Sequence, residues 1–138
     1  MDVTEIPFVK KVGITQSSTG ELELAFSDDT HNHLATIHAS AQFTLAETAS
    51  GEYLQTLFPD LAGKVIPVLR DATIKFKKPA VKTILAYSSV ADESVEKFSA
   101  QFSKKGRATI CVDVVIKDIE NTVTCVASYN WFVQKLET

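Results

Sequence analysis

One segment, residues 38–58, restricts the fold of this chain more than any other. Its apolar side chains recur every four residues, at Ala41, Leu45, Ala49 and Tyr53, which is the spacing of a helix with one apolar face. Most of the remaining residues are alanine, serine, threonine or glycine, so a sheet can lie close to the helix backbone. Such low side-chain bulk is unlike that of an amphipathic surface helix. We therefore expect this helix at the centre of a domain, packed against a sheet.

Segments in which apolar and polar residues alternate lie on both sides of this helix, and such alternation is typical of half-buried strands. They are residues 20–27 before the helix and residues 64–79, 83–92, 107–118 and 122–135 after it. Pro59 ends the helix because proline has no N–H to donate. The last two strands flank a short turn and form a β-hairpin. This order predicts an α+β domain whose antiparallel sheet wraps around one long central helix.

A second helix is predicted over residues 92–106, between the later strands. Asp92 can cap its start and Gly106 its end, and its apolar residues fall on one face. In the last strand, Tyr129 and Trp131 share a face, and we interpret both as core residues. Because the chain has 138 residues and no segment that resembles a linker, we expect a single domain over residues 1–138.

The composition argues against several classes of function. The chain is 45% hydrophobic and 22% charged, as folded soluble proteins are, and its net charge of -3 argues against binding to nucleic acid or anionic membranes. We find no signal peptide and no run of about eighteen apolar residues, so we expect a cytoplasmic protein without membrane contact. Cys111 and Cys125 lie in apolar alternating segments and are predicted to be reduced core residues.

Three histidines, His31, His33 and His38, precede the long helix. Histidines at such spacing can bind a metal ion, and a cupin metal site also begins with two histidines one residue apart. A cupin requires a glutamate shortly afterwards, whereas Thr36 and Ile37 stand there and a helix follows in place of a strand. We therefore expect no metal, and we interpret His38 as a first-turn residue whose ring bonds the backbone or packs.

Two segments resemble a known family. HNHLATIHASAQFTLAETASG (31–51) and ATIKFKKPA (72–80), together with the order of elements, resemble the hot-dog-fold thioesterases of the phenylacetate-degradation (PaaI-like) type. The motif of that family reads approximately H-N-x-x-G-T-V-H-G-G and is followed by an apolar helix with L-x-D or L-x-E. The resemblance covers the chain from residue 20 to its end. It implies a hot-dog domain that forms a homodimer, or a dimer of dimers.

In that family, three groups act together to hydrolyse an acyl-CoA thioester. Carried over by position, the motif histidine is His38, and the N–H of the following residue, Ala39, polarises the thioester carbonyl. The resemblance further implies that Glu47 acts as base or nucleophile and that Asn32 orients the substrate or water. It implies no metal or redox cofactor, since coenzyme A enters only as part of the substrate.

The chemistry of these residue types is consistent with such a function. Free N–H groups at the start of a helix stabilise a developing oxyanion. A carboxylate on an apolar helix inside a sheet has a raised pKa, as suits a base, and Glu47 is the only acidic residue between Asp29 and Glu52. Two simpler interpretations stay open: Glu47 as a solvated residue on the exposed side of the helix, and Asn32 as a turn residue bonded to its own backbone.

The sequence also departs from the family pattern. Ala35, Ala39 and Ser40 replace glycines, and Leu69 stands near the position where the family often has serine or threonine. These departures leave a non-catalytic module that binds acyl thioesters as an alternative function.

A second alternative is a hot-dog β-hydroxyacyl dehydratase. His33 and Glu47 are fourteen residues apart, as are the histidine and glutamate of those enzymes. The proline and glycine residues that surround that pair in the dehydratases are missing, so this alternative ranks behind the thioesterase.

Basic residues gather in two clusters, which are Lys75, Lys77, Lys78 and Lys82 in one and Lys104, Lys105 and Arg107 in the other. Charged residues at strand ends commonly serve only solubility. Coenzyme A carries phosphate charges, however, and a local basic cluster on an acidic protein can bind them. Both clusters are therefore candidate contacts for the coenzyme A phosphates.

Overall fold

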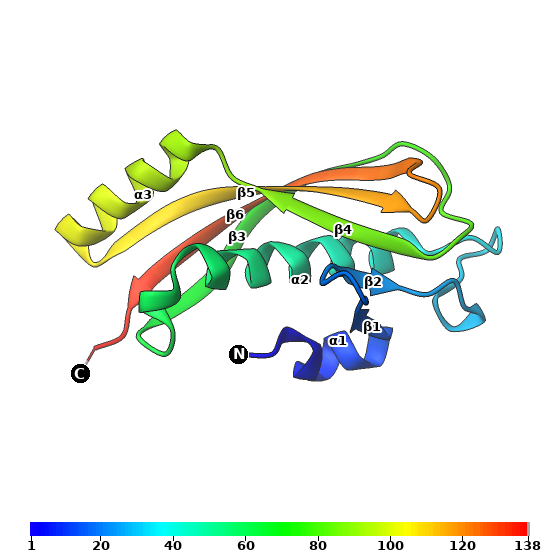
Figure 1. Ribbon diagram of the computed structural model, residues 1–138, viewed down its shortest axis with the longest axis horizontal. Coiled ribbons are helices and arrows are strands. Elements are labelled where there is room, and N and C mark those ends of the chain that lie inside the picture. The colour runs from blue at the N-terminus through cyan, green and yellow to red at the C-terminus, as the bar shows by residue number, and fades with distance from the viewer. Residues whose placement is uncertain (138) are drawn as a thin grey trace.

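A six-stranded antiparallel sheet curves around one long helix in the structure, a computed structural model that describes residues 1–137 (Figure 1). The strand order is β1-β2-β4-β5-β6-β3. The strands are β1 (Ile14–Gln16), β2 (Leu22–Leu24), β3 (Val65–Phe76), β4 (Ile84–Ser89), β5 (Arg107–Asp118) and β6 (Val123–Lys135). The helices are α1 (Pro7–Val12), α2 (Ala39–Leu57) and α3 (Asp92–Lys105), with short 3-10 turns η1 (Val3–Glu5), η2 (Asp28–Thr30) and η3 (Pro59–Leu61). The expected hot-dog arrangement is confirmed.

Helix α2 fills the concave side of the sheet. Leu45 and Ala46 on the helix are fully buried, as are Val112 and Val114 on β5, which packs against it. The Tyr129 hydroxyl donates to the carbonyl of Phe43 at 2.9 Å, so the sheet also bonds to the helix backbone. The helix ends where the proline predicted it would, with η3 directly after it. None of the helices within residues 1–137 combines the length and apolar character needed to cross a membrane.

The N-terminal residues, for which the pattern predicted no element, cover one side of α2. Helix α1 packs against α2, and Val3 and Val9 are each 4% exposed. Gly13 ends α1 at a φ of 93°, a left-handed conformation that suits glycine and turns the chain into β1. Strand β1 then pairs with β2 at one edge of the sheet.

Two predicted strand ends differ from the structure. The strand expected over residues 20–27 is reduced to β2, because Ser27 already caps the turn η2 and leaves Phe26 39% exposed. In β3, the alternation expected over residues 64–79 is interrupted: Ala72 and Ile74 are partly buried, but Arg70 is exposed. The register shifts between Leu69 and Asp71, and the Arg70 guanidinium lies over the ring of Phe132.

Two further expectations need correction. Asp92 does not cap α3, because the cap position is occupied by Ala91 and Asp92 is already the first helical residue. Gly106 does end that helix, at a φ of 71°. Both cysteines carry free thiols, and Cys125 is a core residue, but Cys111 is only partly buried because its side chain points to the outer face of β5.

One buried polar contact gives a test of this packing. Thr124 on β6 is fully buried and donates to the side-chain carbonyl of Gln42 on α2 at 3.0 Å. Thr124→Val removes the donor and leaves a buried acceptor unpaired, so the free energy of unfolding should fall by about 1–3 kcal/mol. Chemical denaturation at one protein concentration measures the change. The matched control is Thr109→Val at an exposed strand position, which should change stability far less; equal effects would contradict this account.

Candidate active site

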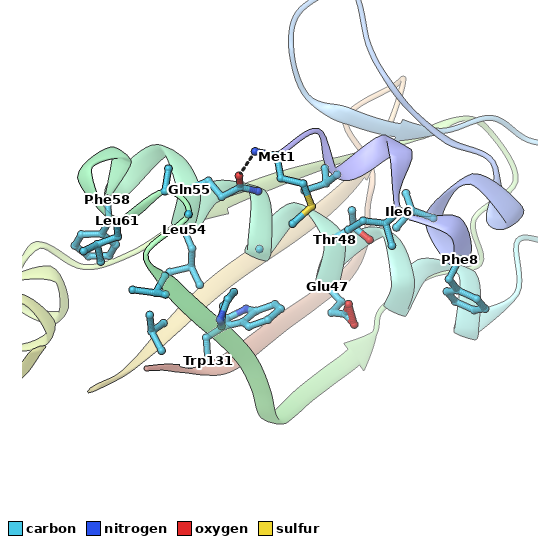
Figure 2. A pocket seen from close by; sticks show the side chains of 18 of the residues that line it. Met1, Ile6, Phe8, Glu47, Thr48, Leu54, Gln55, Phe58, Leu61 and Trp131 are labelled. Carbon is cyan, nitrogen blue, oxygen red and sulfur yellow. Dashed lines mark hydrogen bonds between the residues drawn. The ribbon is translucent and has the colours of Figure 1, made fainter. Parts of the chain in front are cut away.

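A cavity of about 510 Å³ runs along one face of α2. The helix contributes residues spaced three or four apart, which are Thr44, Glu47, Thr48, Gly51, Leu54, Gln55 and Phe58. The N-terminal segment forms one wall, and the ends of β3 and β6 form another (Figure 2). Such a volume is typical of a site for a small-molecule ligand.

Glu47 carries the only ionisable side chain among the cavity-lining residues that the structure describes. It lies toward one end of the cavity, with Phe58 and Leu61 at the opposite end and Trp131 between them (Figure 2). Burial raises the pKa of its carboxyl above the ordinary value of 4.5. Glu47 is therefore half-buried in an apolar cavity rather than on the solvated side of the helix, and it has the raised basicity that proton abstraction requires.

The middle of the cavity is formed by Trp131, which sequence reasoning assigned to core packing alone. Its indole N–H donates to the Ser50 hydroxyl at 2.9 Å, which fixes the ring against α2. Gly51 makes room for this ring, since a Cβ there would lie 3.4 Å from the indole. The small residues along α2 were the only sign in the sequence of an open face on this helix. The residues that form the opposite walls of the cavity come from distant parts of the chain.

The start of α2 provides a free hydrogen-bond donor. His38 is the N-cap, and its Nδ1 accepts from the N–H of Ser40 at 2.9 Å, which confirms that its ring bonds backbone. The His38 carbonyl accepts from the N–H groups of Ala41 and Gln42. Within residues 1–137 the Ala39 N–H has no such partner, and it is solvent-exposed. Ala39 thus presents an unpaired donor at the positive end of a helix dipole.

Asn32 shapes the loop that leads to this helix. Its Oδ1 accepts from the N–H groups of Leu34 at 2.9 Å and Thr36 at 3.1 Å, and its Nδ2 donates to the Thr36 hydroxyl at 2.8 Å. Ala35, where the family has glycine, holds a left-handed φ of 58° inside this loop. The turn role of Asn32 is therefore visible, and these bonds use one of the two hydrogens of its amide.

The other histidines do not join the cavity. His33 is exposed in the loop, and within one chain it does not line the cavity that contains Glu47. The His31 ring packs on Phe26, with centroids 4.5 Å apart, and its Nδ1 lies 3.6 Å from Asp28. No three His, Cys, Asp or Glu side chains converge on a metal-sized space in the part of the chain that the structure describes.

Helix geometry separates the two principal candidate groups. Ala39 and Glu47 are eight residues apart on α2, which corresponds to roughly 12 Å along the helix axis. One chain therefore does not bring this N–H and this carboxylate to the same carbonyl. Leu69, the departure from the family pattern, faces inward opposite Trp131 on the edge strand β3.

The two basic clusters lie at opposite ends of α2. The backbone N–H groups of Lys77 and Lys78 donate to the carbonyl of Thr124, whose side chain bonds Gln42 in the first turns of the helix. This cluster therefore lies beside the helix start, although Lys82 of the same cluster is paired with Glu120 at 3.1 Å.

The second cluster lies near the C-terminal end of α2. Lys105 and Arg107 line a shallow depression together with the end of β6. Directly after β6, the N–H of Leu136 donates to the carbonyl of Lys64, which follows α2 and η3. Only the first cluster is close to the free N–H of Ala39.

Comparison with known structures gives several similar folds. A probable thioesterase of unknown function from Pseudomonas aeruginosa superposes with a TM-score of 0.82 at 21% identity, covering 97% of this chain and 91% of that one. A thioesterase from Haemophilus influenzae gives 0.76 at 18% identity, covering 99% and 88%. A protein from Bacillus halodurans, in a crystal structure with CoA, gives 0.68 at 20% identity, covering 88% and 72%.

These similarities establish the hot-dog fold of this chain. A comparison with functionally curated proteins gives no significant match. A family model does match residues 4–133, which is nearly the whole domain. The chain belongs to the family described as a domain of unknown function, DUF4442.

Proposed function

We propose that this protein hydrolyses an acyl-CoA thioester to the free acid and coenzyme A. The observation that carries the proposal is a single carboxylate with a raised pKa in a largely apolar cavity, on the helix whose start presents a free N–H. Hot-dog proteins of similar structure that bear the name thioesterase, and one crystallised with CoA, support it.

The proposed reaction needs only these groups and water. The Ala39 N–H donates to the thioester oxygen, where negative charge develops during attack. The ionised Glu47 removes a proton from water as the water oxygen bonds to the carbonyl carbon, or attacks that carbon itself to give an anhydride that water then cleaves. The carbon–sulfur bond breaks, and the thiolate leaves and takes up a proton. Asn32 orients the substrate or water through its remaining amide hydrogen.

The separation of Ala39 from Glu47 favours a site shared between two copies of the chain. We propose a homodimer in which Ala39 of one copy and Glu47 of the other face the same carbonyl. The edge strand β3 supports this, since it lies at the end of the sheet and exposes Ile66 (51%) and Val68 (47%). An unpaired strand edge with exposed apolar residues is a ready pairing surface.

Coenzyme A is proposed to enter at the start of α2. Three exposed lysines lie at that end, Lys75, Lys77 and Lys78, and their charges can reach the phosphates of coenzyme A. The cluster of Lys104, Lys105 and Arg107 lies at the other end of the helix and is the weaker candidate within one chain.

Replacement of Glu47 tests the proposed base. Glu47→Gln should lower kcat/KM by roughly 10²–10⁴-fold, because the amide cannot accept the proton from water. Release of free thiol from acyl-CoA substrates measures it. Glu52→Gln is the matched control, since Glu52 lies on the same helix and burial also raises its pKa, but it is not part of the cavity lining. Equal losses in both variants would contradict the assignment.

The parent protein itself distinguishes an enzyme from a binding module. Tight binding of acyl-CoA by the parent protein without thiol release from any substrate would support the non-catalytic binding module.

Ala39→Pro tests the backbone donor without removing a side chain that packs. Proline suits the first position of a helix, and His38 before it has the extended φ and ψ of -61° and 141° that proline requires. The variant should keep its thermal stability and lose roughly 10²–10³-fold in kcat, because the N–H that meets the oxyanion is gone. Ala39→Gly retains the N–H and is the control; a fully active proline variant would exclude this donor.

Mixed dimers test whether the site is shared. A dimer of one Ala39→Pro chain and one Glu47→Gln chain keeps one intact site only if the two groups act across the interface. Co-expression with two affinity tags should then give about half the parent activity per dimer from two inactive partners. No recovery would place both groups of a site in one chain.

The pH profile follows from the environment of Glu47. Burial raises its pKa above 4.5, and the carboxylate must be ionised to act, so kcat/KM should fall as the pH drops through this raised value. The acid limb should therefore show an apparent pKa above 4.5 in rate measurements on a substrate that does not itself titrate there. Glu52→Gln should leave the limb in place. A limb at or below 4.5 would mean that another group controls the rate.

A further inference from the structure

The cavity presents little polar surface beyond Glu47. The Thr44 and Thr48 hydroxyls donate to the helix carbonyls of Ser40 and Thr44, at 2.9 and 2.7 Å. The Trp131 indole N–H is bonded to Ser50. Two further polar groups, the Met1 ammonium and the Gln55 amide, are bonded to each other at one wall, where the ammonium donates to Gln55 Oε1 at 2.9 Å. The rest of the cavity offers a ligand hydroxyl or amide few free partners.

The cavity is long relative to a small acyl group. Glu47 on α2 and Phe58, the residue directly after α2, both line it and are eleven residues apart, which is about 16 Å along the helix axis. An extended chain advances about 1.2 Å per bond, so this distance corresponds to roughly 13 bonds. A phenylacetyl group, whose length is well under half of this, would leave the far part of the cavity empty.

Aromatic side chains close the far end. Phe98 is contributed by α3, the helix inserted between β4 and β5, and its ring lies 4.6 Å from that of Phe58. Phe98 is 2% exposed, so this end is a packed wall. In the middle, Gly51 packs directly against Trp131, since a Cβ there would lie 3.4 Å from the indole, and the cavity runs beside this contact.

We propose that this cavity binds the acyl chain of the substrate, and that this chain is linear and aliphatic, with about 10–14 carbons. The proposal rests on the proposed function for the position of the thioester near Glu47. The chain extends from there along α2, past the contact between Gly51 and Trp131, toward Phe58. The pair of Phe58 and Phe98 sets the upper limit of length.

Binding of thioether analogues of acyl-CoA tests the chain class without hydrolysis. Trp131 is the only tryptophan in the chain and lines the cavity, so its fluorescence reports ligands there. Affinity for S-alkyl-CoA should rise about fourfold per methylene up to a dodecyl chain and then stop rising, because each methylene buries apolar surface. S-phenethyl-CoA should bind far more weakly than S-dodecyl-CoA. Affinities that level off by hexyl, or equal affinity for the phenethyl analogue, would overturn the proposal.

A variant at Gly51 tests the path of the chain. Gly51 is four residues from Glu47, about 6 Å along the axis, and a side chain there would press on the Trp131 ring and into the cavity. Gly51→Leu should therefore weaken S-dodecyl-CoA at least ~100-fold and S-butyl-CoA much less. Thr56→Leu adds the same side chain at an exposed position of α2 and should change neither. Phe58→Ala should shift the optimum to longer chains. An unchanged dodecyl affinity in a folded Gly51→Leu protein would exclude this path.

The two proposals fail in different ways. If chain-length-dependent binding is found but no thioester is hydrolysed, the cavity assignment stands and the enzyme assignment falls. If short or aryl thioesters are hydrolysed with dependence on Glu47 while binding ignores chain length, the enzyme assignment stands and the chain class falls. If Gly51→Leu does not fold, the analogue series on the parent protein still decides the chain class.

Discussion

The structure depends on the close contact between a helix with little side-chain bulk and the inner face of a curved sheet. On the helix side, Ala46 and Ser50 are fully buried, and on the sheet side the large side chain of Tyr129 supplies the volume. Because the sheet contributes most of the bulk, the helix backbone itself becomes a contact surface, as the bond from Tyr129 to the Phe43 carbonyl shows. The same composition leaves Gly51 and Thr48 too small to fill the adjacent face, and a cavity forms there.

That helix also fixes the distances of the chemistry. A helix is a rigid rod, so the donor at its first residue and the carboxylate eight residues later are held at a set spacing that side-chain rotation cannot close. In the proposed function the helix therefore presents two half-sites, and two copies of the chain combine them into one complete site.

The parts of the fold that follow a local period were predictable, and those that depend on distant contacts were not. The boundaries of α2 came from its spacing and from Pro59, and β5 and β6 from alternation. The register shift between Leu69 and Asp71 was not predictable, because it depends on the pairing of β3 with β6 and leaves no local pattern in the sequence. The N-terminal segment that packs against α2 shows no regular pattern of apolar residues, so η1 and α1 were not predicted.

The candidate site was likewise predictable only where it depends on local sequence. Glu47 stood out because it is the sole acidic residue in a long apolar stretch, and His38 because it precedes a helix. The cavity itself escaped prediction, since Trp131 and Phe98 reach it from elements far along the chain. Asn32 was left between two roles, and its bonds to Leu34 and Thr36 now show that one of them is to build the loop.

The half-buried carboxylate of Glu47 lowers the stability of the fold in the ionised form that the proposed reaction requires. Since burial raises its pKa, the folded chain holds the proton more tightly than the unfolded chain does, and stability declines as the pH rises through the raised value. At neutral pH the ionised group is thus a built-in weakness of the fold. Laboratory selection for heat resistance alone would favour neutral residues at this position, and under the proposed function the most stable variants selected in this way would be the least active.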